Sequence, residues 1–125
     1  MDSPAQTGPL NGHADSPNLE SIKTAFRVSV DEGFVAGMEA LLAIATDDCE
    51  FRPYTADRVL HGHDEIRAFY RGAAEAGTEM KLRPVRFREV GDSVVVDGTM
   101  RVLRASGGFS ESQISWTYRF RDGRL

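Results

Sequence analysis

The end of the sequence alternates between polar and apolar residues over a long stretch. Residues 111–125 read ESQISWTYRFRDGRL, which ends in a turn-like RDG segment. Such alternation is typical of a half-buried antiparallel strand, because successive side chains point to opposite faces. One face then carries four apolar side chains, Ile114, Trp116, Tyr118 and Phe120. This face must line either a core or the wall of a cavity.

The same alternation begins near Lys81 and is interrupted twice by turn residues. Gly91-Asp92 and Gly107-Gly108 divide it into three long segments, which predicts an antiparallel meander. If Gly107-Gly108 is a two-residue hairpin loop, Arg104 lies opposite Glu111, and the opposite charges of this pair support the register.

This register determines which residues share a face with the aromatic row. It brings three polar residues to that face: Asp97 opposite Tyr118, Thr99 opposite Trp116 and Arg101 opposite Ile114. The reverse face then carries an apolar strip directed away from the helices, composed of Val96, Met100 and Val102, with Val85 and Phe87 added unless a bulge changes their facing. Because monomers seldom leave such a strip exposed, we expect a homodimer packed sheet to sheet with Met100 near its centre.

Helical spacing dominates the sequence before the sheet. Ser16-Pro17 is typical of a helix start, and apolar residues then recur at Leu19, Ile22, Phe26 and Val30. Gly33 and Gly37 bracket a break, after which a second short helix contains Met38, Leu41, Leu42 and Ala45 and ends near Asp47-Asp48. The two helices are expected to form a hairpin.

A third helix is expected after His61-Gly62-His63-Asp64. Its buried face would carry Ile66, Phe69, Tyr70 and Ala73, and Gly77 suits its C-terminal exit. Two short strands are expected before it, at 49–53, where Pro53 requires an edge or end position, and at Val59-Leu60. The chain is therefore expected to be α+β, with a flexible tail over 1–16 and a single domain over 17–125.

Composition and charge limit the classes of partner that can be expected. The chain has 125 residues, 41% of them hydrophobic, and a net charge of −4, so we expect one domain with a real core. There is no basic cluster with interleaved aromatics, which argues against nucleic acid, and no apolar run that approaches membrane-spanning length. Cys49 is the single cysteine, so no intrachain disulfide is expected, and we predict a cytoplasmic protein.

The order of elements, the segment LHGHDEIRAFYR and the closing WTYRFRDGRL carry a family resemblance. From about Asn18 to the end, the chain resembles the nuclear transport factor two-like superfamily, also called SnoaL-like. The resemblance implies a cone, in which a strongly curved sheet wraps three helices around an internal pocket. The superfamily holds enzymes, binding proteins and association domains on one scaffold. Its members usually continue into a final strand, so we expect either further residues after Leu125 or an uncovered sheet edge.

The pattern of the ketosteroid isomerases in this superfamily carries over only in part. The position of their base aspartate, counted back from Gly62, falls on Pro53, and that of their oxyanion-side acid falls on Trp116. Their early tyrosine has no match in the first helix, and only Tyr70 coincides with a pocket tyrosine. Because that proton transfer needs a carboxylate base over the substrate, an isomerase of this type is not expected.

The expected register makes Asp97 the candidate acid or base. Desolvation would raise its pKa, whereas Arg101 or Tyr118 would lower it, and a structural ion pair with an arginine such as Arg86 is the alternative. Tyr70 is either a substrate donor or a core residue, and His61 is a possible second acid/base at the pocket mouth. The candidate substrate-binding residues are Trp116, Tyr118, Arg101, Thr99, Phe120, Ile114 and Tyr54.

Neither a metal nor a cofactor is expected. His61-Gly62-His63 has ligand residue types, but without a matched third ligand the pattern is more typical of a loop and helix start. Two function classes remain open. One is a small cofactor-free enzyme that performs acid/base chemistry, such as isomerisation, cyclisation, dehydration or hydrolysis, on a compact hydrophobic molecule; the other is a non-catalytic ligand-binding or association domain. An isolated carboxylate with a raised pKa in the pocket would favour the first, and a pocket plugged by side chains the second.

Overall fold

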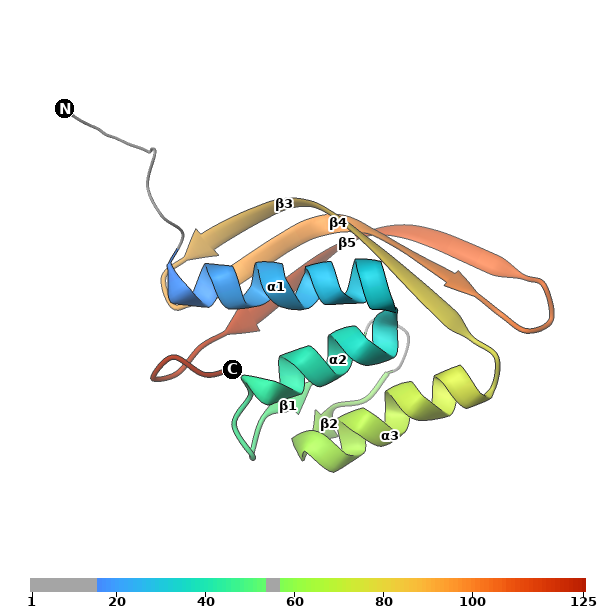
Figure 1. Cartoon of the computed structure of the whole chain (residues 1–125), viewed down its shortest axis with the longest axis horizontal. Helices are drawn as coiled ribbons and strands as arrows, with labels where there is room; N and C mark the ends of the chain where they lie inside the picture. The colour runs from blue at the N-terminus through green and yellow to red at the C-terminus, as the bar shows by residue number, and fades with distance from the viewer. Residues whose placement is uncertain (1–15, 54–56) are drawn as a thin grey trace.

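The computed structural model describes residues 16–53 and 57–125. In this part of the chain, three helices and two short strands precede a three-stranded antiparallel sheet, which confirms the α+β class. Figure 1 shows the long strands curving over the helices, with α1 next to the sheet. Apart from Ser16, the expected tail over 1–16 lies outside the described residues. Within the described residues, no helix is long and apolar enough to cross a membrane.

Helix α1 spans Pro17–Glu32 and begins as expected. The Leu19 amide donates to the Ser16 hydroxyl over 3.1 Å, and Pro17 occupies the first turn. The buried stripe of α1 comprises Ile22, Ala25, Phe26 and Ser29. The expectation that Val30 continues this stripe is wrong, since its side chain is 55% exposed. Ser29 takes that place because it lies two helical turns after Ile22, and one more residue rotates Val30 away by about 100°.

Helix α2 spans Phe34–Ala43 and so begins earlier than the glycine pattern predicted. Gly33 alone makes the break, with a φ of 105°. Gly37 lies inside α2, where a Cβ atom would come within 2.5 Å of the Ser29 Cβ. This glycine therefore permits close contact between α1 and α2 rather than ending a helix.

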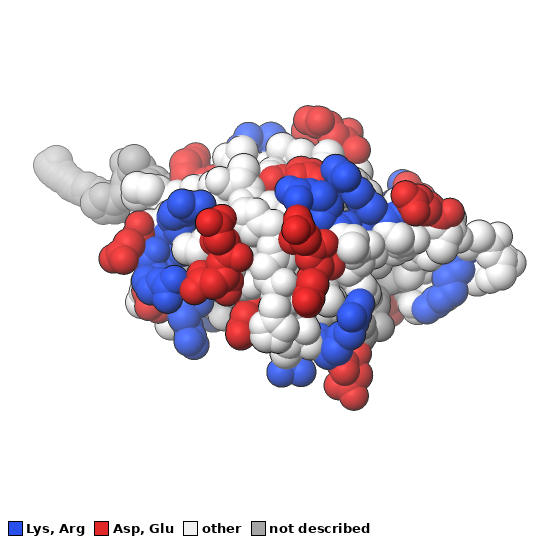
Figure 2. All heavy atoms as spheres, turned by 90° about the horizontal axis from the view of Figure 1, so that it is seen from below, with Lys and Arg blue, Asp and Glu red and all other residues white. Residues whose placement is uncertain are grey.

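The short strands β1, Glu50–Phe51, and β2, Leu60–His61, pair antiparallel and lead into α3, Gly62–Glu75. Glu39 of α2 forms ion pairs with Arg67 at 2.8 Å and Arg71 at 2.9 Å on α3, which joins these two helices. Figure 2 shows acidic and basic side chains interspersed over the face seen from below.

Strands β3, Glu79–Val90, β4, Ser93–Leu103, and β5, Phe109–Arg119, form the expected meander in the order β3-β4-β5. The first turn is the expected two-residue connection, since Val90 pairs with Ser93. A bulge between Pro84 and Arg86 leaves Val85 unpaired and 74% exposed.

The register expected for β4 and β5 is wrong. The Arg104 amide donates to the Gly108 carbonyl at 2.8 Å, and the Gly107 amide donates to the Arg104 carbonyl at 2.9 Å. With Gly107 at a φ of 93°, the connection is a three-residue loop instead of a Gly-Gly turn. As a result, every β4–β5 pair is shifted by three residues from expectation; Val94 is opposite Tyr118, Val96 opposite Trp116 and Asp97 opposite Ser115. Successive side chains of a strand point to opposite faces of the sheet. A shift by an odd number of residues therefore places the β4 residues that were expected beside the aromatic row on the opposite face of the sheet.

The apolar strip on β4 consequently faces the helices. Val96 is fully buried and Met100 is 6% exposed, packed in a cluster bordered by Phe34 and Tyr70. Phe87 pairs with Val96 and packs against Phe26, with ring centroids 5.7 Å apart. The expected dimer interface centred on Met100 is therefore wrong, because these residues form the core. A homodimer itself stays a prediction.

Candidate functional site

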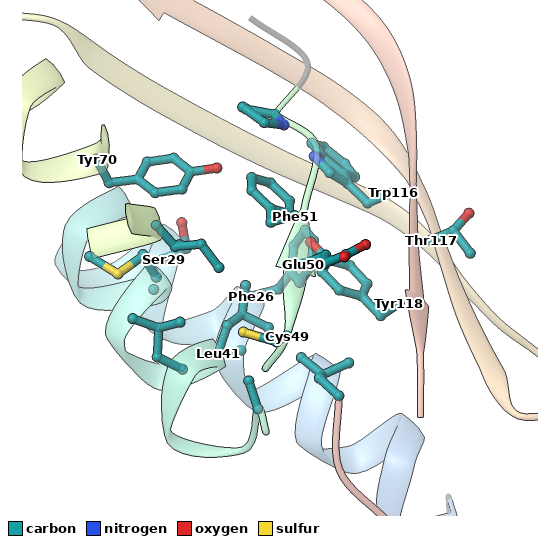
Figure 3. A pocket seen from close by; sticks show the side chains of 18 of the residues that line it. Phe26, Ser29, Leu41, Cys49, Glu50, Phe51, Tyr70, Trp116, Thr117 and Tyr118 are labelled. Carbon is teal, nitrogen blue, oxygen red and sulfur yellow. The ribbon is translucent and has the colours of Figure 1, made fainter. Parts of the chain in front are cut away.

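A cavity of about 690 Å³ lies between the helices and the sheet. Figure 3 shows side chains from α1, α2, α3, β1 and β5 surrounding it. Most of the described lining is aliphatic or aromatic, with a few hydroxyl groups inside and charged residues among the rest. Such a cavity is not plugged by its own side chains, and its size is typical of small-molecule sites, about 300–1,000 Å³.

The sheet wall of the cavity is aromatic. Trp116, Tyr118 and Phe120 all belong to the lining, as the alternation along β5 predicted. The ring of Phe26 meets Trp116 edge-on at 5.3 Å and Tyr118 at 5.9 Å between centroids. These edge-to-face contacts stabilise the position of the aromatic wall against α1.

Tyr70 enters the cavity from α3. Its ring lies 5.9 Å from Phe51 and 5.2 Å from Phe69 between centroids, and its hydroxyl points into the open space in front of Phe51 and Trp116 (Figure 3). Burial raises the pKa of Tyr70 well above its ordinary value. Burial likewise raises the pKa of Tyr118, to which the neighbouring Tyr70 adds. Both phenols therefore remain neutral at physiological pH, and neither makes a hydrogen bond within the described residues.

Ser29 is a pocket residue that the sequence analysis did not identify. It lies on the buried stripe of α1, is 9% exposed and lines the cavity. Its Oγ is buried and has no hydrogen-bond partner among the described residues. The available signal was a polar residue at helical spacing from Ile22 and Phe26, on the face that α1 turns toward the core.

The carboxylates of the described lining lie on exposed side chains. Asp48 accepts a hydrogen bond from Thr46, and this bond, the backbone and nearby Arg121 hold the pKa of Asp48 below its ordinary value. Glu50 forms a 3.3 Å pair with His61 Nδ1, and both side chains are more than half exposed. Burial raises the pKa of the Cys49 thiol, so that it stays protonated. The buried polar groups are thus neutral donors, and the charged groups are in contact with solvent.

The expectation that Asp97 lines the cavity is wrong. Because of the shifted register, Asp97 lies on the outer face of the sheet, where Ser115 Oγ donates to it at 2.6 Å and Arg88 Nε at 3.2 Å. The Ser115 hydrogen bond, followed by that from Arg88, holds the pKa of Asp97 below its ordinary value. Asp97 is a structural ion-pair residue, the alternative that the sequence left open, although its partner is Arg88 instead of Arg86.

The register also removes two other expected residues from the cavity. Thr99 pairs with Gln113, and Arg101 pairs with Glu111 at 3.5 Å, on the same outer face as Asp97. Ile114 shares the inner face but packs against the Met80 and Met100 cluster, outside the described lining.

The remaining expected residues lie at the edge of the site or beyond it. His61 is exposed, and only its partner Glu50 belongs to the described lining. Tyr54 lies outside the described residues. His63 does not face a metal site; its Nε2 lies 3.0 Å from the Thr46 carbonyl. Within residues 16–53 and 57–125, no three His, Cys, Asp or Glu side chains gather to hold a metal ion.

Comparison with known proteins identifies this arrangement. A family model described as a SnoaL-like domain matches residues 26–125. No curated protein matches the chain.

Solved structures share the fold over most of the chain. An NTF2-like protein of unknown function from Burkholderia pseudomallei is 28% identical, with a TM-score of 0.72, over 88% of this chain and 86% of that one. TerC, co-crystallised with polyporic acid, is 29% identical, with a TM-score of 0.70, over 87% of this chain and 85% of that one. A putative SnoaL-like polyketide cyclase from Jannaschia sp. is 16% identical, with a TM-score of 0.66, over 90% of this chain and 85% of that one, which shows a shared fold alone.

Proposed function

The chain belongs to the SnoaL-like domain family, and from this membership and the form of its cavity we propose that it binds a compact, largely hydrophobic small molecule between the helices and the sheet. The observation that carries the proposal is the open cavity of about 690 Å³ whose aromatic wall is held by Phe26, Trp116 and Tyr118. An apolar body buried there would lose its contact with water, and this transfer supplies most of the binding free energy.

The polar groups of the cavity support orientation of the ligand. The neutral hydroxyls of Tyr70 and Tyr118 have no partner within the described residues, so each is available to a ligand atom. A few convergent polar groups in an apolar pocket are the usual means of fixing one binding pose. A ligand with apolar flanks and oxygen acceptors would match both features.

TerC supports the same ligand class. It is 29% identical to this chain and was co-crystallised with polyporic acid, an aromatic quinone. We therefore choose polyporic acid as the first probe of this cavity, without assuming that it is the natural ligand.

Binding, as opposed to proton abstraction, is the function that the cavity supports. Among the described lining residues, no buried carboxylate with a raised pKa is present, and Asp48 and Glu50 are exposed. A general base should lie near the substrate proton with a pKa close to the working pH. Tyr70 and Tyr118 can donate protons, but neutral phenols with raised pKa values are poor bases.

The single tryptophan provides a direct test, since Trp116 lies in the cavity wall. Polyporic acid should quench its fluorescence with a saturable, micromolar dissociation constant, after correction for absorption with free N-acetyltryptophanamide. Leu41→Phe, which narrows the cavity, should weaken binding about tenfold because overpacking costs about 1–3 kcal/mol. Val30→Phe, at an exposed position of α1, is the matched control and should bind normally. Linear, unsaturable quenching or equal affinities in both variants would contradict the proposal.

A further inference from the structure

The hydroxyl of Ser29 is a polar group that no described residue satisfies. Its Oγ is buried with no hydrogen-bond partner among the described residues, and the residue lines the cavity. A buried hydroxyl without a hydrogen bond destabilises a fold, and in helices a serine usually avoids this by bonding a carbonyl of the preceding turn. Ser29 makes no such bond, so its hydroxyl is available to a polar group that a ligand would bring to this part of the cavity.

The surroundings of Ser29 restrict its movement. Gly37 on α2 approaches so closely that a Cβ atom there would lie 2.5 Å from Ser29 Cβ and 2.9 Å from its Oγ. The α1 carbonyl of Ser29 is itself engaged, accepting the Gly33 amide at 3.0 Å. The close contact between the two helices thus fixes the place of the Ser29 side chain beside the cavity.

A second donor opens onto the same side of the cavity. Figure 3 shows the Tyr70 hydroxyl directed toward the open space of the cavity, and Ser29 belongs to the lining of the same cavity. The Tyr70 side chain is half-buried, and its hydroxyl makes no hydrogen bond with another described residue. No carboxylate among the described lining residues is buried beside these hydroxyls, so a ligand cation would find no counter-charge there. An uncharged oxygen acceptor is the group that two neutral donors in an apolar cavity recognise best.

We infer that Ser29 is a ligand-binding residue, whose hydroxyl donates, together with the Tyr70 phenol, to a carbonyl oxygen of the bound molecule. The ligand class is then a ketone or quinone with apolar flanks that contact Trp116 and Phe51. This inference rests on the proposed function, since it assigns the polar end of the same cavity. On this basis, the cavity binds a carbonyl compound more tightly than a hydrocarbon of the same shape.

Two ligands that differ only in a carbonyl group can measure the contribution of that group to binding. Benzophenone and diphenylmethane differ in one group, C=O against CH₂, and their binding can be measured by titration calorimetry on the full chain. Ser29→Ala should weaken benzophenone binding about fivefold, the effect of one neutral hydrogen bond, and leave diphenylmethane binding unchanged. Ser21→Ala is the matched control, because Ser21 lies on the same helix with its hydroxyl bonded to the Pro17 carbonyl at 2.9 Å.

A stability measurement provides a readout that does not require a ligand. Because Ser29→Ala removes a buried hydroxyl without a partner, it should raise the melting temperature of the unliganded protein by about 3 °C. It should therefore fold, and the loss of benzophenone affinity would not reflect damage to the structure. A lower melting temperature would mean that the hydroxyl is satisfied by a structural water, and would overturn the inference.

The remaining outcomes are also decisive. Equal weakening of both ligands would show that Ser29 acts through cavity shape alone, and unchanged benzophenone affinity would show that its hydroxyl does not contact the ligand. Either result would overturn the inference while leaving the proposed function intact. If polyporic acid, benzophenone and diphenylmethane all fail to bind the wild-type protein, the proposed function fails and the inference fails with it.

Discussion

Polar groups on the two faces of the sheet differ in whether they have hydrogen-bond partners. On the outer face, Asp97 is bonded to Ser115 and Arg88, and Arg101 is paired with Glu111. On the inner face and across the cavity, the hydroxyls of Tyr70 and Tyr118 have no partner within the described residues. Polar groups that satisfy each other hold the sheet together, whereas groups left unsatisfied beside an open cavity are available to a ligand. In this protein the difference indicates the candidate ligand-binding face more directly than the distribution of charge does.

The largest expected effect tests whether the packing of the inner face of the sheet against α1 contributes most to the free energy of unfolding. Phe26 is 2% exposed and its ring contacts Phe87, Trp116 and Tyr118. Phe26→Ala should lower the free energy of unfolding by about 3–5 kcal/mol, because it opens a void among these rings. Urea denaturation followed by circular dichroism measures this.

The matched control for Phe26 lies at the far end of the sheet. Phe109 is 63% exposed, and the Arg101 guanidinium lies over its ring, 5.5 Å from the centroid. Phe109→Ala should change the free energy of unfolding by less than about 0.5 kcal/mol. Similar losses for the two variants would mean that the aromatic wall is not the core of the fold.

The second-largest expected effect concerns the close approach of β3 and β4 at the bulge. Gly98 lies on β4 opposite the β3 bulge, and a Cβ atom there would come within 2.2 Å of the Arg83 carbonyl oxygen. Gly98→Ala should therefore destabilise the protein by about 2 kcal/mol, because backbone must move to admit the methyl group. Thermal unfolding measures the loss.

The control for Gly98 is a glycine with free space around it. At Gly72, in α3, a Cβ atom would have nothing within 4 Å among the described atoms. Gly72→Ala should stabilise the protein by about 0.5–1 kcal/mol, since alanine is the better helix former. A neutral Gly98→Ala would show that the strands separate easily at the bulge.

The smallest expected effect tests whether Asp97, on the outer face, stabilises the fold without contributing to ligand binding. Asp97→Asn should leave ligand affinity unchanged, because Asp97 lies away from the cavity. It should slightly lower the melting temperature at pH 7, since the amide cannot replace a carboxylate that Ser115 and Arg88 stabilise.

The pH dependence of this effect has a definite sign. The folded-state pKa of Asp97 is below its unfolded value, so its contribution is complete above the unfolded pKa of about 3.9 and is lost as pH falls through the folded value. The difference in melting temperature between Asp97→Asn and wild type should therefore shrink below about pH 4. A loss of ligand binding at pH 7 in a stable Asp97→Asn variant would contradict the assignment of this residue to structure.

The candidate site was predictable where it depended on one strand and unpredictable where it depended on two. Trp116 and Tyr118 alternate along β5 and Phe120 directly follows it, so their common face followed from their spacing. Asp97, Thr99 and Arg101 were assigned through a pairing, and Gly107-Gly108 suits two hairpin loops of different length. The charge of Glu111 did not resolve the choice, because arginines stand at both 101 and 104; the structure pairs it with Arg101.

The local sequence determined the elements of this protein. Ser16-Pro17 set the start of α1, the period of the apolar residues distinguished helices from strands, and Gly91-Asp92 closed the first hairpin, because each depends on interactions between near neighbours in the chain. Only the tertiary structure decided which face of β4 meets the helices, that Gly37 lies within a helix, and that Ser29 lines the cavity without a hydrogen-bond partner among the described residues. These features depend on contacts between distant segments, where a shift of an odd number of residues or a few tenths of an ångström changes which groups meet.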